Sequence, residues 1–375
     1  MQIKPFNIGY GVTVLGASSV RSELDGIGYY TQELGARLTA TGYQLKPYQF
    51  GHTGLDAFQG QRVHDWPGYP QTTLLSALTG LSLPGSNRLK DKVDLFHSTD
   101  HYIPLIKSVP HIATLMDAIP LSNPEWMASR FRGLKNRIRK TTAKWPDHII
   151  TISEYSKSQL IEHFGLRSEN ISISYLGVDS RYHARLDPEV IRSYLNKRGL
   201  GEQFFLFVGT LQPRKNLGNL VDAHRMLPPH IRKAFPLVIV GRVGWGETNW
   251  KALFSQEHVF WFQQTTDLEK RTLMQQATAM VFPSLAEGFG LPVIEAFASS
   301  LPVIASNTTS IPEVAGDAAL LVDPKDTGMI SEAMMTLAAN ESVRQEMRQK
   351  GLARATQSTW EACAAATLKA YQRVL

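Results

Sequence analysis

Short apolar runs alternate with helical spacing through the second half of the chain. The apolar runs lie at 204–208, 236–240, 258–262, 279–282 and 302–305, with a possible sixth at 318–322. Helical spacing separates most of them, most clearly at 217–227, 267–276 and 290–299. This alternation predicts a doubly wound parallel sheet, in which ligands bind beyond the carboxyl ends of the strands. We therefore expect the chemistry in the loops after Val208, Val240 and Phe282.

The first half repeats this rhythm less regularly. Strands are predicted at 8–15, 93–97, 111–116 and 148–152, and Ser153 is a predicted helix N-cap. The segment 51–84 is rich in Gly, Pro, Thr and Gln, which predicts long loops. The fold class is thus α/β, with two Rossmann-like domains at 1–180 and 181–357 and a deep cleft between them. A last helix at 358–375 is expected to cross back to the first domain.

Composition narrows the class of protein. The chain has 375 residues, 43% of them hydrophobic and 19% charged, which excludes a disordered chain and favours two domains. The single cysteine, Cys363, rules out an internal disulfide framework, and no apolar run is long enough for a membrane helix. We therefore expect a cytoplasmic protein. The net charge of +6 favours anionic partners, but we find no nucleic-acid module and no metal-ligand spacing.

The strongest chemical signal is the segment 287–292, Glu-Gly-Phe-Gly-Leu-Pro, which follows a predicted strand and opens a predicted helix. Glycines let the backbone approach a ligand closely, and the free amides at a helix start bind anions. Glu287 could hydrogen-bond sugar hydroxyls, and Glu295, about two turns further on, could reach a ribose. The alternative is a solvated helix start with two ordinary glutamates, but the whole arrangement favours a binding loop.

Two weaker signals follow other strands. Arg214 and Lys215 lie in the loop after the strand at 204–208, where a guanidinium and an ammonium can neutralise a diphosphate. An isolated Arg-Lys pair is more often a solvated turn, but its expected position on the same rim as Glu287 favours function. Gly26 and Gly28 follow the first strand and suit a phosphate or a sugar, although many loops contain two glycines.

These motifs resemble glycosyltransferase family 4, a retaining family with the GT-B architecture. The resemblance covers nearly the whole chain and is densest at 209–217 and from 283 to 319. It implies that Arg214 and Lys215 bind the diphosphate of a nucleotide sugar and that Glu287 contacts the donor sugar. The donor contacts that it implies are Gly26, Gly28, Gly288, Phe289, Gly290, Leu291 and Glu295. It implies no cofactor and no metal, because cations and helix amides take over the charge stabilisation.

The chain departs from the family pattern at two places. Relatives often have His-Asp where this chain has Met116-Asp117, so Asp117 becomes the polar candidate for catalysis. His97 and His101 could replace the missing histidine as acceptor or sugar contacts, although a lone histidine is more often structural. Relatives usually carry a glycine where this chain has Ser299-Ser300, and we expect a packing adjustment there without loss of activity.

Partners and reaction remain partly open from the sequence. The donor is a GDP- or UDP-sugar, with a lean toward mannose from GDP-mannose, and the acceptor is a saccharide or a lipid-linked saccharide. The basic stretch 130–145 is either a solvated helix face or a peripheral contact with the inner face of a membrane. The alternative functions are another GT-B enzyme, such as an epimerase or a phosphorylase, and a non-catalytic nucleotide-sugar-binding protein.

Overall fold

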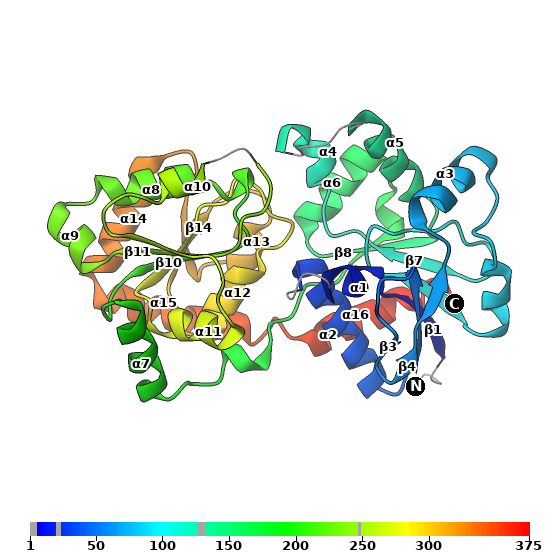
Figure 1. Cartoon of the computed structure of the whole chain (residues 1–375), viewed down its shortest axis with the longest axis horizontal. Helices are drawn as coiled ribbons and strands as arrows, with labels where there is room; N and C mark the ends of the chain where they lie inside the picture. The colour runs from blue at the N-terminus through cyan, green and yellow to red at the C-terminus, as the bar shows by residue number, and fades with distance from the viewer. Residues whose placement is uncertain (1–5, 20–23, 127–131, 247–248) are drawn as a thin grey trace. The chain divides into compact units, whose positions relative to one another are not determined.

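The computed structural model describes residues 6–19, 24–126, 132–246 and 249–375. The chain divides into two compact units (Figure 1). Unit 1 spans residues 1–124, 129–177 and 360–375, and unit 2 spans residues 125–128 and 178–359. Each unit has its own parallel sheet, so the predicted α/β fold with two Rossmann-like parts is confirmed.

Unit 1 is built on a seven-stranded sheet with the order β5-β2-β1-β6-β7-β8-β9, in which all neighbours are parallel. The strands are β1 (Asn7–Gly11), β2 (Gln44–Phe50), β5 (His64–Trp66), β6 (Leu95–Ser98), β7 (His111–Thr114), β8 (His148–Thr151) and β9 (Ile171–Ile173), with a separate antiparallel pair of β3 (Ala57–Phe58) and β4 (Gln61–Arg62). The strand order reverses between β1 and β6.

Two helices of unit 1, α2 (Gly26–Ala40) and α6 (Glu154–Phe164), begin at side-chain N-caps. The helices of the unit are α1 (Thr13–Ser19), α2, α3 (Tyr69–Thr79), α4 (Ile119–Ser122), α5 (Arg132–Thr142), α6 and α16 (Trp360–Tyr371), with 3-10 turns η1 (Ser86–Asp91), η2 (Pro124–Trp126) and η3 (Ser168–Asn170) near them in the chain. Asp25 caps α2 by accepting a hydrogen bond from the Gly28 amide at 2.9 Å. Ser153 caps α6 through the Ser156 amide, as predicted.

Two predictions for unit 1 were wrong. The first strand ends at Gly11 and the chain then enters α1, so the predicted strand 8–15 is too long. The segment 51–84 is not a set of long loops, since it contains β3, β4, β5 and α3. The spacing of apolar residues did not predict α3, because the residues that this helix buries are Thr72, Thr73 and Ser76.

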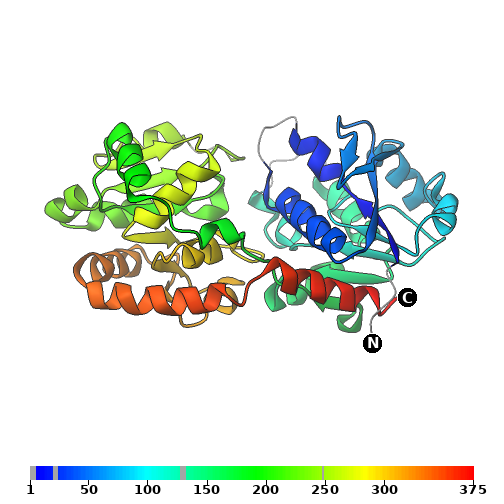
Figure 2. The same cartoon turned by 90° about the horizontal axis from the view of Figure 1, so that it is seen from below.

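The last helix belongs to unit 1, as predicted, and packs against α2 (Figure 2). Trp360 is almost completely buried, with its ring 5.7 Å from that of Tyr29 and 6.4 Å from that of Tyr30. Arg37 on α2 adds an ion pair of 2.7 Å with Glu361. Burial of two aromatic pairs contributes more than the exposed ion pair, because exposed pairs are worth about 0–1 kcal/mol.

Unit 2 is a six-stranded parallel sheet with the order β12-β11-β10-β13-β14-β15. Its strands are β10 (Phe205–Val208), β11 (Leu237–Val240), β12 (Val259–Phe262), β13 (Ala279–Phe282), β14 (Val303–Ser306) and β15 (Ala319–Val322). Its helices are α7 (Pro188–Arg198), α8 (Leu217–Met226), α9 (Pro229–Ala234), α10 (Trp250–Leu253), α11 (Asp267–Gln276), α12 (Leu291–Ala298), α13 (Ile311–Ala315), α14 (Thr327–Ala339) and α15 (Glu341–Ala355), with 3-10 turns η4 (Ser180–Tyr182) and η5 (Pro213–Lys215).

The order of the strands in unit 2 fixes where a ligand fits. The first strand of the unit, β10, lies in the middle, with β11 on one side and β13 on the other, which is the order of the doubly wound dinucleotide-binding fold. The direction of winding therefore changes between β10 and β13. A crevice forms at such a switch point beyond the carboxyl ends of the strands. The loops after Val208 and Phe282 lie at this edge, as the sequence pattern predicts.

Candidate active site

Three charged side chains meet at the switch point of unit 2. Arg214 and Lys215 lie on η5 after β10, and Glu287 lies in the loop between β13 and α12. The Arg214 guanidinium donates to Glu287 Oε2 at 2.6 Å, and the Lys215 ammonium donates to Oε1 at 2.5 Å. The sequence predicted both cations and the glutamate on one rim, and the structure brings all three into direct contact.

Burial and charge act in opposite directions on this cluster. Burial alone would raise the pKa of Glu287, but the charges of Arg214 and Lys215 outweigh it and lower that pKa to about 2. Burial lowers the pKa of Lys215 to about 8, despite the attraction of Glu287. The cluster thus carries a net charge of one positive at neutral pH. Fixed cations of this kind stabilise negative charge that develops on a leaving group.

The Lys215 ammonium contacts the Glu287 carboxylate and the Phe282 ring. It lies 4.6 Å from the centroid of the Phe282 ring at the end of β13, and its side chain is 7% exposed. Asn216 follows with a positive φ of 59° and donates to the Pro283 carbonyl at 3.1 Å, which ties the loop after β10 to the loop after β13. Leu285 closes the same junction by donating to the Arg214 carbonyl at 2.7 Å.

The loop that carries Glu287 is fixed by residues that the sequence analysis did not select. Thr309 Oγ1 accepts from the Glu287 amide at 3.2 Å, and Ser310 Oγ donates to the carbonyls of Glu287 and Phe289 at 2.9 and 3.1 Å. Two hydroxyl residues before a helix have no distinctive sequence signal. Gly290 caps α12 with a φ of 98°, which strains any other residue, and a Cβ there would lie 2.5 Å from Ile311 Cδ1, so the Ile311 side chain would have to shift.

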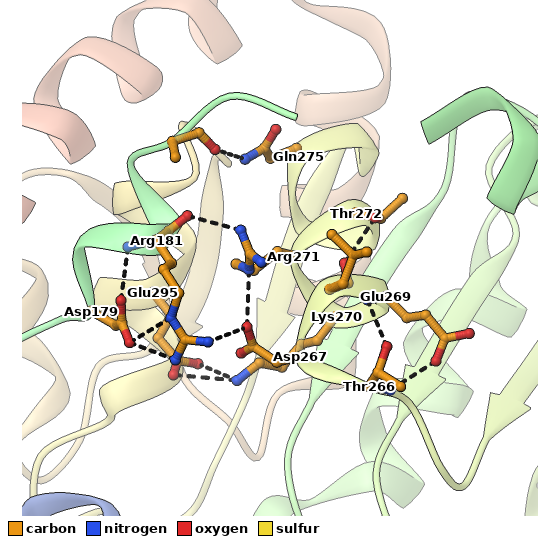
Figure 3. Close-up of polar contacts among 12 residues, drawn as sticks. Asp179, Arg181, Thr266, Asp267, Glu269, Lys270, Arg271, Thr272, Gln275 and Glu295 are labelled. Carbon is orange, nitrogen blue, oxygen red and sulfur yellow. Dashed lines mark hydrogen bonds and ion pairs between the residues drawn. The ribbon is translucent and has the colours of Figure 1, made fainter. Parts of the chain in front are cut away.

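Glu295 lies inside α12 and faces a cation that the sequence analysis also missed. Its carboxylate is 3.4 Å from Lys270 Nζ through both oxygens, and the glutamate is 7% exposed (Figure 3). The same ammonium lies 5.0 Å from the centroid of the Tyr182 ring. Lys270 comes from α11, which begins at a capping box formed by Thr266 and Glu269. The box fixes the start of α11 and therefore the direction of Lys270.

An ion-pair network surrounds this second pair. Arg181 donates to Asp179 at 2.6 Å and to Asp267 at 3.0 Å, and Arg271 donates to Asp267 at 3.0 Å (Figure 3). The network ties the chain entering unit 2 to the first turn of α11. Because Asp179 is largely buried, this pairing fixes the position of η4 and of the Tyr182 ring beside Lys270.

The site residues predicted in unit 1, His97, His101 and Asp117, have different environments. His97 is fully buried, and its ring nitrogens contact Tyr371 Oη at 2.7 Å and Thr114 Oγ1 at 2.8 Å. Burial lowers the pKa of His97 to about 3, so the ring is neutral and structural. His101 is exposed, and Asp117 accepts from the Ile119 amide at 3.0 Å at the start of α4.

The remaining predictions of the sequence analysis have these positions. Gly26 and Gly28 lie in the first turn of α2 rather than in a loop before it. Ser300 has a positive φ of 58°, which explains why a glycine suits this position, and Arg185 donates to its hydroxyl at 2.9 Å. In the basic stretch, α5 covers Arg132–Thr142, and Arg130 lies outside the described residues.

The described residues contain no group of three or more His, Cys, Asp or Glu side chains that could hold a metal ion. None of the helices within those residues is both long enough and apolar enough to cross a membrane.

Two doubly wound sheets, with a cation cluster at the switch point of the second, have the architecture of the GT-B class of nucleotide-sugar glycosyltransferases. The model of the glycosyl transferases group 1 matches residues 194–354, and that of glycosyltransferase family 4 matches residues 24–182. O-antigen chain mannosyltransferase B from Escherichia coli is 32% identical over 76% of this chain and 76% of its own length. The chain belongs to glycosyltransferase family 4, a family of retaining hexosyltransferases.

Other relatives agree with this family. The serotype-specific mannosyltransferase WbdA from Escherichia coli is 28% identical over 61% of this chain, which spans only 29% of the length of WbdA. The crystal structure of HepE from Anabaena in complex with UDP covers 98% of this chain and 100% of its own, with a TM-score of 0.73 and 17% identity. This likeness shows the shared GT-B fold.

Proposed function

We propose that this chain transfers mannose from GDP-mannose to a saccharide or lipid-linked saccharide acceptor in polysaccharide synthesis. The choice of mannose is supported by the relatives, since the E. coli proteins similar to this chain are named as mannosyltransferases. The name of the first, an O-antigen chain enzyme, supports a growing glycan chain as the acceptor.

The observation that carries the proposal is the contact of Arg214 and Lys215 with one carboxylate at the switch point of unit 2. The donor diphosphate would replace Glu287 in some of its contacts with Arg214 and Lys215, and its negative charge would neutralise the net positive charge of the cluster. As the glycosidic bond breaks, negative charge grows on the leaving phosphate, and the two cations and the amides at the start of α12 stabilise it. The leaving phosphate then accepts the proton of the attacking hydroxyl.

Glu295 would bind the ribose of the donor, with Lys270 holding its carboxylate in place. A carboxylate with two oxygens can accept from both ribose hydroxyls, which is the contact that nucleotide-binding folds use. The buried position of Glu295 favours this role because a buried carboxylate needs partners. Asp117 and His101 in unit 1 remain proposed contacts of the acceptor or of the transferred sugar.

The test is a donor screen followed by a turnover assay. Thermal unfolding is measured with GDP-mannose, GDP, UDP-glucose and UDP, and a ligand at 100 times its Kd raises the free energy of unfolding by about 2.7 kcal/mol. We expect the guanosine ligands to raise the melting temperature most. Release of GDP only in the presence of a mannose-containing acceptor then supports transfer.

The same assay separates the alternatives. An epimerase would change the sugar with no acceptor present, and a phosphorylase would need inorganic phosphate. Nucleotide-sugar binding without turnover on any acceptor would favour a binding protein. A larger shift with UDP-glucose than with GDP-mannose would overturn the choice of donor while leaving the glycosyltransferase activity in place.

A further inference from the structure

Helix α3 has its polar face inside and its apolar face outside. Its buried residues are Thr72, Thr73 and Ser76. The leucines of the helix and of the turn after it are exposed: Leu74 by 46%, Leu75 by 48%, Leu78 by 78% and Leu81 by 63%. A helix of a soluble protein normally buries its apolar stripe, so four exposed leucines on one short segment indicate a surface that contacts something apolar.

The neighbouring helix supplies the opposite property. Helix α5 packs against α3, and Figure 1 shows both on the upper side of unit 1. Its described cations are Lys135, Arg137, Arg139 and Lys140, with Lys144 just beyond its end. The chain has no acidic residue between Glu125 and Asp147.

Next to these cations lies a hollow of about 540 Å³, lined by Gly133, Asn136, Arg137, Lys140, Thr141, Lys144 and Trp145. Three cations and an indole around one hollow suit a phosphate headgroup, because the cations neutralise the phosphate. Tryptophan side chains prefer the level of the headgroups, where the ring is in an apolar region and the N–H is near water. Leu134 on the same helix is 55% exposed.

The segment that contains α3 also lacks acidic residues. The chain has no acidic residue between Asp65 and Asp91, and the cations Arg88 and Lys90 are exposed on η1. Lys107 is also exposed and donates to the Gly80 carbonyl at the end of α3 at 2.9 Å. Helix α3 thus contacts the basic helix α5 and, at its end, Lys107, which is the pattern of an interfacial segment on an anionic bilayer.

From this arrangement we propose that the α3–α5 surface of unit 1 docks on an anionic phospholipid bilayer. This surface is defined as Leu74, Leu75, Leu78, Leu81, Leu134, Arg137, Lys140, Lys144 and Trp145. The leucines enter the boundary between headgroups and acyl chains, and the cations meet the phosphates. A second copy of this chain is the less favoured occupant, because two copies would bring the same positive charges together.

The proposal is independent of the donor site. The surface lies in unit 1, whereas the cation cluster and Glu295 lie in unit 2. Membrane docking would place the enzyme where a lipid-linked acceptor is present, but the surface would bind vesicles whether or not such an acceptor is the substrate. Failure of the docking test therefore leaves the proposed transfer untouched.

The experiment is co-sedimentation of the full chain with large vesicles. One set contains phosphatidylcholine alone, and the other contains equal parts of phosphatidylcholine and phosphatidylglycerol. We expect binding to the anionic vesicles only, weakened by added salt. A variant with Arg137→Gln, Lys140→Gln and Lys144→Gln should bind at least about tenfold more weakly, since it loses three cations that are attracted to the anionic surface.

The apolar half is tested by Leu74→Ser with Leu78→Ser, for which we also expect a loss of at least about tenfold, because two leucines no longer bury apolar surface in the bilayer. The matched control for the cations is a triple variant in unit 2, Lys197→Gln with Lys233→Gln and Lys251→Gln, and the control for the leucines is Met226→Ser. All four positions are exposed. These should bind like the parent, and melting curves verify that every variant is folded.

Several results would overturn the proposal. These are no binding to anionic vesicles, equal binding to neutral ones, or binding that both sets of α3–α5 variants leave unchanged. A concentration-dependent dimer in light scattering that Leu74→Ser with Leu78→Ser abolishes, with no vesicle binding by the parent, would assign the surface to a second copy.

Discussion

The contact between Lys215 and Glu287 makes an unusual prediction about stability. Lys215→Met keeps the length of the side chain and removes its charge. The pKa of Lys215 is lowered from 10.5 to about 8, mainly by burial, which corresponds to about 3 kcal/mol of cost for the charged form at neutral pH. Glu287 retains its 2.6 Å contact with Arg214, so its carboxylate is not left unpaired. We expect the variant to have an unfolding free energy equal to that of the parent or up to about 3 kcal/mol higher.

Glu287→Gln should change stability in the opposite direction. It removes the anion shared by two cations and leaves Arg214 and Lys215 next to each other. The pKa of Glu287 is lowered from 4.5 to about 2 because the two cations outweigh burial, and this lowering corresponds to about 3 kcal/mol of stabilisation. Removing one partner of a buried ion pair costs about 3–5 kcal/mol in general, so a loss of about 3 kcal/mol is expected.

Activity should fall in both variants although their stabilities diverge. In Lys215→Met, loss of one fixed donor to the developing negative charge should reduce turnover by about 10²–10³. In Glu287→Gln, turnover should fall because the carboxylate proposed to contact the donor sugar is lost. Denaturant unfolding measures the stabilities, and release of the nucleoside diphosphate measures turnover, with exposed Lys197→Met as the control. If Lys215→Met is destabilised as much as Glu287→Gln, the attraction outweighs the burial and the reasoning fails. Parental turnover in Lys215→Met would exclude Lys215 from the chemistry.

Three further predictions follow from the site. Because the pKa of Lys215 in the folded protein is about 8, kcat/KM should fall above pH 8 as the ammonium loses its proton, and Lys215→Arg should move this fall to higher pH. The free energy of unfolding should rise between pH 8 and 10.5, because the unfolded chain binds more protons than the folded one in that range. Gly290→Ala should cost about 1–3 kcal/mol in denaturant unfolding, given its φ of 98° and the contact with Ile311, and a neutral result would refute this. Lys270→Met should raise the KM for the donor with little change in kcat, because Glu295 loses its orienting cation, and Lys270→Arg should restore the KM. If Lys270 were purely structural, Lys270→Met would lower the free energy of unfolding without raising KM selectively.

Hydrophobic pattern was sufficient for unit 2 and insufficient for parts of unit 1. Strands such as β10 and β11 are buried on both faces, so they appear in the sequence as uninterrupted apolar runs that end in glycine. Helix α3 has no such signal, since the residues it buries are threonines and a serine. Between Ile8 and Leu15 only Thr13 is polar, and one polar residue in so short a run does not mark the break between β1 and α1 at Val12.

The sequence placed the charged residues of the site on one edge but could not pair them. Loop positions follow from strand order, and Arg214, Lys215 and Glu287 all follow strands that flank the switch point. Which side chain contacts which depends on the path of each loop, and 72 residues separate Lys215 from Glu287 in the chain. Thr309 was missed for the same reason, because only the folded loop brings its hydroxyl to the Glu287 amide.

The contacts of the two cations differ, and this difference predicts an order of events when the proposed donor binds. Arg214 also donates to the Ala286 carbonyl at 2.8 Å and to Gln212 at 2.9 Å, so its guanidinium stays in place if a contact with Glu287 is lost. Lys215 is held by Glu287 and by the Phe282 ring, and a single-point ammonium reorients at little cost. An arriving diphosphate should therefore draw Lys215 away from Glu287 first. That step frees Glu287 Oε1 to accept from a sugar hydroxyl, so binding of the phosphates prepares the carboxylate for the sugar.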